Sequence, residues 1–141
     1  MPTGAGIRVA GRAAPLSREA VERIVAAVLA AEGREALLSV SFLGRGAMRD
    51  LNHRWTGRDA VTDVLAFPLR LPGGRLAGDI YVCPWVAGRE AAEREIPLRQ
   101  ELTRLVVHGV LHILGYDHPE GPHRTRSPMW RRQERLVRRL R

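Results

Sequence analysis

Residues 98–118 have the sequence LRQELTRLVVHGVLHILGYDH. Most of this stretch is apolar at helical spacing, which predicts a largely buried helix. His108 and His112 are four residues apart, so they project from the same face of that helix. Gly115 then ends the helix, because glycine adopts a left-handed conformation without steric cost, and the chain turns back towards His118. The segment therefore predicts a helix and a turn that present three histidines to one metal ion.

The spacing of these histidines is typical of a catalytic zinc site. Three neutral imidazoles at about 2.0–2.1 Å from Zn²⁺ leave the fourth tetrahedral position for water. Asp117 is the only adjacent side chain that offers a fourth ligand, because the single cysteine, Cys83, is distant in sequence. A lone histidine is usually an ordinary core or surface group, but four of the five in this chain fall between residues 108 and 123. We therefore predict one Zn²⁺ per chain, and its ligands are His108, His112 and His118.

Outside this stretch the sequence alternates short strands and helices, and it contains no repeat. The predicted strands lie in the segments 7–11, 37–43, 62–69 and 78–83. Within the third segment, we expect the strand to end at Pro68. The predicted helices run from a Ser17 cap to about Ala31, from about Gly46 to Trp55, from Pro84 to about Glu95, from Leu98 to about Leu114, and from Pro128 to Leu140. We expect a single α+β domain over residues 1–141. Its four-stranded mixed sheet is covered by helices, with the metal-binding helix near the C-terminus.

The composition indicates a basic intracellular domain. The formal net charge is +8, and all 23 basic residues are arginine. Such a charge attracts polyanions, nucleic acid above all, and a basic surface without a specific partner is an equal alternative. The single cysteine excludes an intramolecular disulfide and fits the reducing cytoplasm, and no segment is predicted to cross a membrane or to act as a secretory signal. We therefore expect a cytoplasmic protein without membrane attachment.

Arginines are concentrated in the last predicted helix. They are Arg131, Arg132, Arg135, Arg138, Arg139 and Arg141. These side chains either follow the phosphates of a nucleic acid or form a solvated face, and the second interpretation is the simpler one. His53 and His123 lie outside the zinc spacing and are also expected to be solvated.

The histidine spacing matches that of the metzincin zinc peptidases with one difference. Those enzymes place a glutamate after the first histidine as the general base for peptide cleavage, whereas this chain has Gly109. We expect a substrate other than peptide, and we expect that a glutamate at this position would repel phosphate near the metal.

Three blocks of the sequence resemble the YbeY family of bacterial metal-dependent endoribonucleases, which are also ribosomal RNA maturation factors. They are LNHRWTGRDAVTDVLAFP (51–68), GDIYVCP (78–84) and HGVLHILGYDH (108–118), with a looser block at MWRRQERLV (129–137). The resemblance implies a zincin-like fold and a zinc site at His108, His112 and His118. It also implies cleavage of single-stranded RNA, with roles in maturing the 3′ end of small-subunit ribosomal RNA and in ribosome quality control. The implied partners are ribosomal RNA precursors and the small ribosomal subunit.

One position departs from the family pattern. Members usually have an arginine that assists cleavage immediately before Gly57, and here that position is Thr56. Arg58 is the candidate that partly replaces it, and Arg54 is a second candidate for binding substrate.

The general base is not fixed by the sequence. Asp117 is a candidate general base or a hydrogen-bond acceptor for a ligand imidazole, and it could equally be an aspartate that only caps the turn. Asp63 and Asp79 either orient ligand imidazoles or cap turns.

Two alternatives from other functional classes remain. One is a zinc peptidase with a non-standard base, which a peptide cleavage assay would detect. The other is a non-catalytic ribosome-binding factor with a structural zinc, which the open fourth ligand position argues against.

Overall fold

The computed structural model describes residues 6–11, 15–117 and 123–140. Its strands are β1 (Ile7–Ala10), β2 (Leu37–Phe42), β3 (Val64–Arg70) and β4 (Leu76–Val82). Its helices are α1 (Arg18–Glu32), α2 (Arg45–Thr56), α3 (Pro84–Arg94), α4 (Leu98–Ile113) and α5 (Pro128–Arg139). Short 3₁₀ turns lie at Pro72–Gly74 and Arg124–Arg126. The predicted order of elements is confirmed within these ranges.

The strands form one mixed sheet in the order β1-β2-β4-β3. β1, β2 and β4 are parallel, and β3 runs antiparallel to β4 at the edge. The expectation that the third strand ends at Pro68 is wrong, because the strand continues to Arg70 and Pro68 pairs with Gly78. An edge strand tolerates proline, since one side of it makes no ladder hydrogen bonds. The predicted α+β class with a four-stranded mixed sheet is confirmed.

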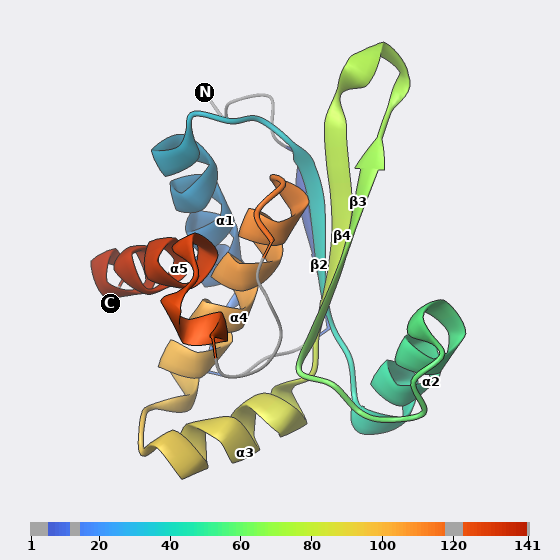
Figure 1. The fold of residues 1–141 in the computed structure, drawn as a ribbon, viewed down its shortest axis with the longest axis vertical. Coiled ribbons are helices and arrows are strands. Elements are labelled where there is room, and N and C mark those ends of the chain that lie inside the picture. The colour runs from blue at the N-terminus through green and yellow to red at the C-terminus, as the bar shows by residue number, and fades with distance from the viewer. Residues whose placement is uncertain (1–5, 12–14, 118–122, 141) are drawn as a thin grey trace.

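Local signals in the sequence account for the limits of α1. The Ser17 hydroxyl accepts a hydrogen bond from the backbone N–H of Ala20 at 3.1 Å, and Gly33 closes the helix in a left-handed conformation with φ +63°. Val25 and Val28 of this helix are fully buried in the core. Figure 1 shows α1, α4 and α5 on one side of the sheet, whereas α2 lies on the other side.

Helix α4 lies directly against the sheet because two glycines let it approach. A Cβ atom at Gly109 would lie 2.6 Å from Cγ2 of Ile80, and a Cβ atom at Gly78 would overlap Ile113. Gly109 is buried and faces the sheet. A glutamate side chain at this position would meet the core, so packing is a second physical reason, beside the expected repulsion of phosphate, that it should not favour catalysis.

The predicted end of α4 is also confirmed. Gly115 has a φ of +107°, and its backbone N–H donates to the carbonyl of His112 at 3.0 Å. The N–H of Tyr116 donates to the carbonyl of Leu111 at 3.0 Å. These two bonds form a Schellman motif, which turns the chain back sharply after the last helical residue. In the described ranges, no helix has both the length and the apolar character needed to span a bilayer.

Candidate active site

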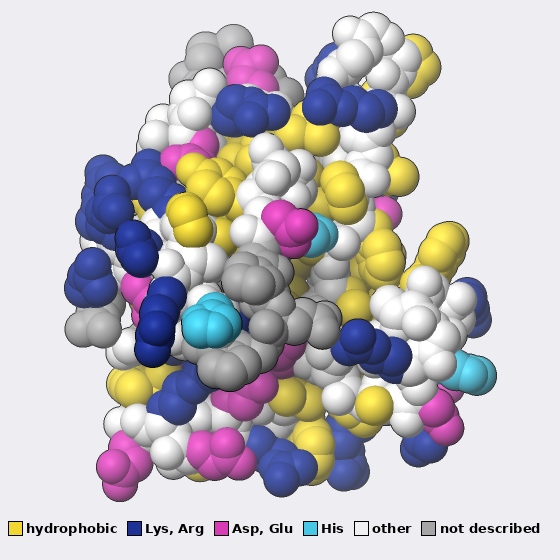
Figure 2. Space-filling view, in the orientation of Figure 1, with side chains coloured by type: hydrophobic (Ala, Val, Ile, Leu, Met, Phe, Trp, Pro, Cys, Tyr) yellow, Lys and Arg dark blue, Asp and Glu magenta, His cyan; other side chains and the backbone are white. Residues whose placement is uncertain are grey.

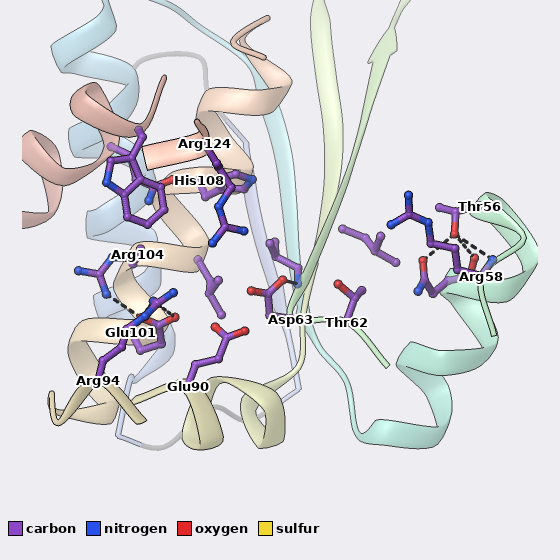
Figure 3. A pocket seen from close by; sticks show the side chains of 16 residues that line it. Thr56, Arg58, Thr62, Asp63, Glu90, Arg94, Glu101, Arg104, His108 and Arg124 are labelled. Carbon is purple, nitrogen blue, oxygen red and sulfur yellow. Dashed lines mark hydrogen bonds and ion pairs between the residues drawn. The ribbon is translucent and has the colours of Figure 1, made fainter. Parts of the chain in front are cut away.

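A cleft of about 450 Å³ opens between α2 and the helices of the core side. Figure 3 shows Thr56 and Arg58 on the α2 side, with His108 and Arg124 on the opposite side. Asp63, just before β3, lies between the two sides. The cleft is therefore lined by one predicted zinc ligand, His108, together with acidic and basic side chains.

His108 is held by a residue from α5. Its Nδ1 atom lies 2.8 Å from Oε1 of Gln133, whose side chain is only 1% exposed. Nε2 of Gln133 donates to Oε2 of Glu134 at 3.0 Å. Burial alone would raise the pKa of Glu134, but hydrogen bonds from Arg104 and Gln133 outweigh it and hold that pKa below its usual value. Glu134 is thus a carboxylate that only accepts hydrogen bonds.

The charge on Glu134 fixes the orientation of the glutamine amide. The amide nitrogen of Gln133 must face the carboxylate, so its oxygen faces His108. Nδ1 of His108 is then the donor of the 2.8 Å hydrogen bond, so the neutral imidazole carries its lone pair on Nε2. This is the tautomer that a metal-binding histidine requires when it coordinates through Nε2.

An ion-pair network holds Glu134 in place beside Gln133. Arg104 donates two hydrogen bonds to Glu134, through Nε at 2.8 Å and through Nη2 at 2.7 Å. Its Nη1 donates a third hydrogen bond to Glu101 at 2.6 Å. The Glu134 hydrogen bond is the largest of the interactions that raise the pKa of Arg104 above its usual value. Arg94 donates to both oxygens of Glu101 at 2.8 and 2.9 Å, and Glu101 is fully buried. The network fixes Glu134, and through it Gln133.

A second carboxyl group in the cleft retains a proton near neutral pH. Burial, followed by a hydrogen bond with Glu101 and the charge of Asp63, raises the pKa of Glu90 to about 8. Figure 3 shows the carboxyl groups of Glu90 and Asp63 close together between the walls of the cleft. Glu90 can therefore donate a proton inside the cleft at neutral pH.

The arginine candidates differ in position. Arg58 lines the cleft, as predicted for a residue that contacts phosphate, whereas Arg54 is exposed and is not among the described lining residues. Thr56 donates a hydrogen bond to the side-chain oxygen of Asn52 at 2.7 Å, which ties the end of α2 together. Arg124 also lines the cleft, and its guanidinium lies 5.6 Å from the ring centroid of Trp130.

The remaining predicted site residues are spread around this centre. His112 is half-buried one turn after His108 on α4, and His118 lies outside the described residues. In the described part of the chain, no three His, Cys, Asp or Glu side chains gather as a metal site. The zinc site thus stays a prediction, with two of its three ligands placed on one helix. Asp117 is exposed, and the described residues that line the cleft do not include it.

The aspartates of the two strand blocks have separate roles. Asp63 lines the cleft, and its carboxylate accepts a hydrogen bond from the N–H of Val64 at 2.7 Å. Asp79 follows Gly78, which faces α4, so its side chain points to the opposite side of the sheet. There it accepts the hydroxyl hydrogen bond of Ser39 at 2.6 Å. The hypothesis that Asp79 orients a ligand imidazole is therefore wrong.

The histidines outside the zinc spacing are both exposed, as predicted: His53 and His123. On the surface, Figure 2 shows arginine side chains gathered over the α5 side of the molecule. Arg132 of this group is engaged within the fold, because its Nε donates to Glu32 of α1 at 2.8 Å. Arg141 lies outside the described residues. Whether the exposed members contact phosphate stays an open prediction.

Sequence reasoning missed Gln133, Arg104, Glu90 and Arg124. A signal for Gln133 was present, because Met129 and Leu136 place it on the buried stripe of α5, where a polar residue needs a partner. The spacing of Glu101 and Arg104 on one helix was a local signal for their pair, whereas the positions of Glu90 and Arg124 in the cleft follow only from the tertiary fold.

Comparison with known proteins places the chain in a family. The sequence model of the family Endoribonuclease YbeY matches residues 11–141. The chain belongs to the YbeY family. An Endoribonuclease YbeY from an Anaeromyxobacter species is 42% identical over 130 residues, which cover 88% of this chain and 67% of the relative. The Endoribonuclease YbeY of Halorhodospira halophila is 41% identical over 118 residues, which cover 79% of this chain and 76% of the relative.

The solved structures include a protein with the same fold as this YbeY family member. The solution structure of TM1509 from Thermotoga maritima superimposes with a TM-score of 0.66 at 28% sequence identity. The match covers 95% of this chain and 88% of the other. The overall fold is therefore shared with this structure.

Proposed function

We propose that this protein is a zinc-dependent endoribonuclease that hydrolyses phosphodiester bonds in single-stranded RNA. We further propose that it matures the 3′ end of small-subunit ribosomal RNA in the cytoplasm, acts in ribosome quality control, and binds ribosomal RNA precursors and the small ribosomal subunit. Membership of a family named for endoribonuclease activity supports the reaction class.

The position of His108 is the observation that carries the zinc proposal. Gln133 engages Nδ1, so the neutral imidazole carries its lone pair on Nε2, and the described residues that line the same cleft include four arginines. His112 follows one helical turn later, at the spacing that lets two imidazoles share one ion. These donors suit Zn²⁺, and we propose His108, His112 and His118 as its ligands, with one ion per chain.

Each group in the cleft has a chemical task in this proposal. A zinc ion bound there would polarise a phosphoryl oxygen or lower the pKa of a water molecule. Arg58 and Arg124 bind the phosphate from opposite sides, because guanidinium groups match its oxygens. Water forms the new P–O bond and releases a proton to the solvent, while Glu90 delivers its proton to the leaving oxygen as the old P–O bond breaks. Gln133 keeps His108 in position.

The zinc proposal is tested by elemental analysis of protein purified without chelators. We expect about one zinc per chain in the wild type and a sharp loss in His112→Ala. The matched control is His53→Ala, which removes an exposed histidine of α2 and leaves the zinc content unchanged. Absence of any bound transition metal in the wild type would overturn the proposal.

The activity is tested with ribosomal RNA precursors. The metal-loaded protein is incubated with them, with and without chelator, and the ends are mapped. Cleavage in single-stranded regions that chelator abolishes is expected, with cuts at the small-subunit 3′ end. No cleavage by fully metal-loaded protein would contradict the proposal.

The peptidase alternative lacks support in the structure. The residue after the first histidine, Gly109, faces Ile80 in the core, so this helix has no room for a base at that position. A peptide substrate incubated with the same preparation should remain intact.

A further inference from the structure

Three aromatic rings form a contiguous group on the side of the sheet opposite α4. The ring centroids of Trp55 and Phe67 are 5.8 Å apart, and those of Phe67 and Tyr81 are 5.9 Å apart. We call Trp55, Phe67 and Tyr81 the aromatic row. Successive strand residues alternate between faces, and Ala66 and Ile80 belong to the core side, so the two strand rings must point away from it.

The aromatic row is open to solvent at Trp55, whereas Phe67 and Tyr81 are half-buried. Trp55 is 65% exposed, and Leu69, on the same side of β3 as Phe67, is 49% exposed. Figure 1 shows that α2 is the helix on this side of the sheet, whereas α1, α4 and α5 lie on the other. Scattered apolar residues on a surface are ordinary, but a contiguous group of partly exposed rings is typical of a binding surface.

The aromatic row begins where the cleft ends. Leu65 lies two residues before Phe67 on the same side of β3, pairs with Tyr81, and lines the cleft. Thr56, the neighbour of Trp55 on α2, lines the cleft as well. A ligand that fills the cleft and extends beyond it along β3 therefore meets the three rings.

We propose that the aromatic row is a stacking site for the bases of single-stranded RNA next to the phosphate held in the cleft. This inference rests on the proposed function, which supplies the RNA backbone between Arg58 and Arg124. Aromatic rings stack on any nucleobase, because every base has a π-face, and they tolerate sequence variation for the same reason. The row therefore selects unpaired bases over a duplex, whose bases are already stacked.

The charges favour this orientation of the strand. Asp79 lies opposite Phe67 in the register of β3 and β4, and its carboxylate is held by Ser39. A carboxylate repels phosphate but accepts hydrogen bonds from the N–H groups of bases. The bases consequently lie over the sheet and the phosphates lie towards the arginines of the cleft.

The test compares two ligands of equal charge. One is a fluorescently labelled octamer of uridine, and the other is an octamer of the same ribose-phosphate backbone without bases. Anisotropy titrations of the full-length protein should show about tenfold tighter binding of the octamer with bases. Trp55→Ala should lose most of this preference, and Trp55→Phe should keep it. The integrity of each oligomer is checked on a gel after titration.

The chain offers a matched control in Trp85. It is also exposed, at 42%, but the guanidinium of Arg45 lies 4.3 Å and that of Arg89 lies 5.1 Å from its ring centroid. Trp85→Ala should leave the preference for bases unchanged. Thermal unfolding of all three variants shows that each one folds.

The outcomes separate this inference from the proposed function. One outcome is that the wild type cleaves RNA but Trp55→Ala keeps the full preference for bases. The stacking site is then refuted and the aromatic row serves another partner such as a protein, whereas the nuclease proposal stands. If the wild type prefers bases through Trp55 but cleaves no RNA, the stacking site stands and the nuclease proposal fails. Equal binding of both octamers by the wild type refutes the stacking site.

Discussion

The side-chain oxygen of Gln133 lies 2.8 Å from Nδ1 of His108, across 25 residues of sequence. The partner that orients a metal-binding imidazole typically contributes about 10–100-fold to metal affinity. Gln133→Leu should therefore weaken zinc binding by about that factor, measured by competition with a chromophoric chelator. Gln100→Leu, the same substitution at a position of α4, is the control and should have no effect. Equal affinities in the two variants would show that the amide does not act on the metal site.

Arg58 and Arg124, which both line the cleft, should contribute separately to RNA binding. For single strands, the logarithm of the binding constant falls by about 0.7 per phosphate contact for each unit of log salt concentration. Arg58→Ala and Arg124→Ala should each weaken binding of an RNA octamer and reduce this slope. Arg23→Ala, which removes an exposed arginine of α1, should leave both quantities unchanged. An unchanged salt slope in Arg58→Ala would show that this residue does not replace the missing family arginine. Thr56→Arg, which restores an arginine immediately before Gly57, should raise cleavage of RNA.

The protonated carboxyl of Glu90 makes stability depend on pH. Its pKa lies at about 8 in the fold against an ordinary value of 4.5, so between these values the folded chain keeps a proton that the unfolded chain releases. The free energy of unfolding should therefore fall as pH rises from about 4.5 to about 8. Urea denaturation across this range should show a smaller fall in Glu90→Gln. Glu93→Gln, at an exposed position of the same helix, should retain the wild-type fall. The same pH dependence in both variants would disprove the assignment.

The contact between α4 and the sheet predicts an unusual response to alanine. Alanine favours a helix over glycine by about 1 kcal/mol, but overpacking a core costs about 1–3 kcal/mol. Gly109→Ala should thus destabilise the protein despite the helical gain, because its Cβ meets Ile80. Gly88→Ala in α3, where a Cβ would meet nothing within 4 Å, should stabilise it.

A double-mutant cycle checks the cause of the Gly109 effect. Ile80→Ala removes the atoms that a new Cβ at position 109 would contact. Gly109→Ala should therefore cost less in the Ile80→Ala background than in the wild type. Strictly additive changes in the free energy of unfolding would show that the clash lies elsewhere.

Local signals predicted the parts of the structure that depend on neighbouring residues. The limits of α1 follow from Ser17 and Gly33, and the pairing of His108 with His112 follows from helical spacing alone. The limit of β3 was misplaced at Pro68, since its tolerance of proline depends on its position at the edge of the sheet.

The environment of the site could not be predicted in the same way. Gln133 and Glu134 meet His108 and Arg104 across 25 and 30 residues, and no local pattern specifies which helices pack together. The proton on Glu90 likewise depends on burial beside carboxyl groups from two other segments. The sequence therefore identified the candidate ligands but not the residues that position them.

The placement of Gln133 on α5 has a consequence for the order in which the protein matures. The ribosome makes a chain from its N-terminus, so α4 with His108 is synthesised before the helix that orients it. Sheet and α4 can pack as they emerge, but the imidazole acquires its hydrogen-bond partner only when α5 docks. The newly made protein thus completes its candidate catalytic centre only after α5 has been synthesised and Gln133 has met His108.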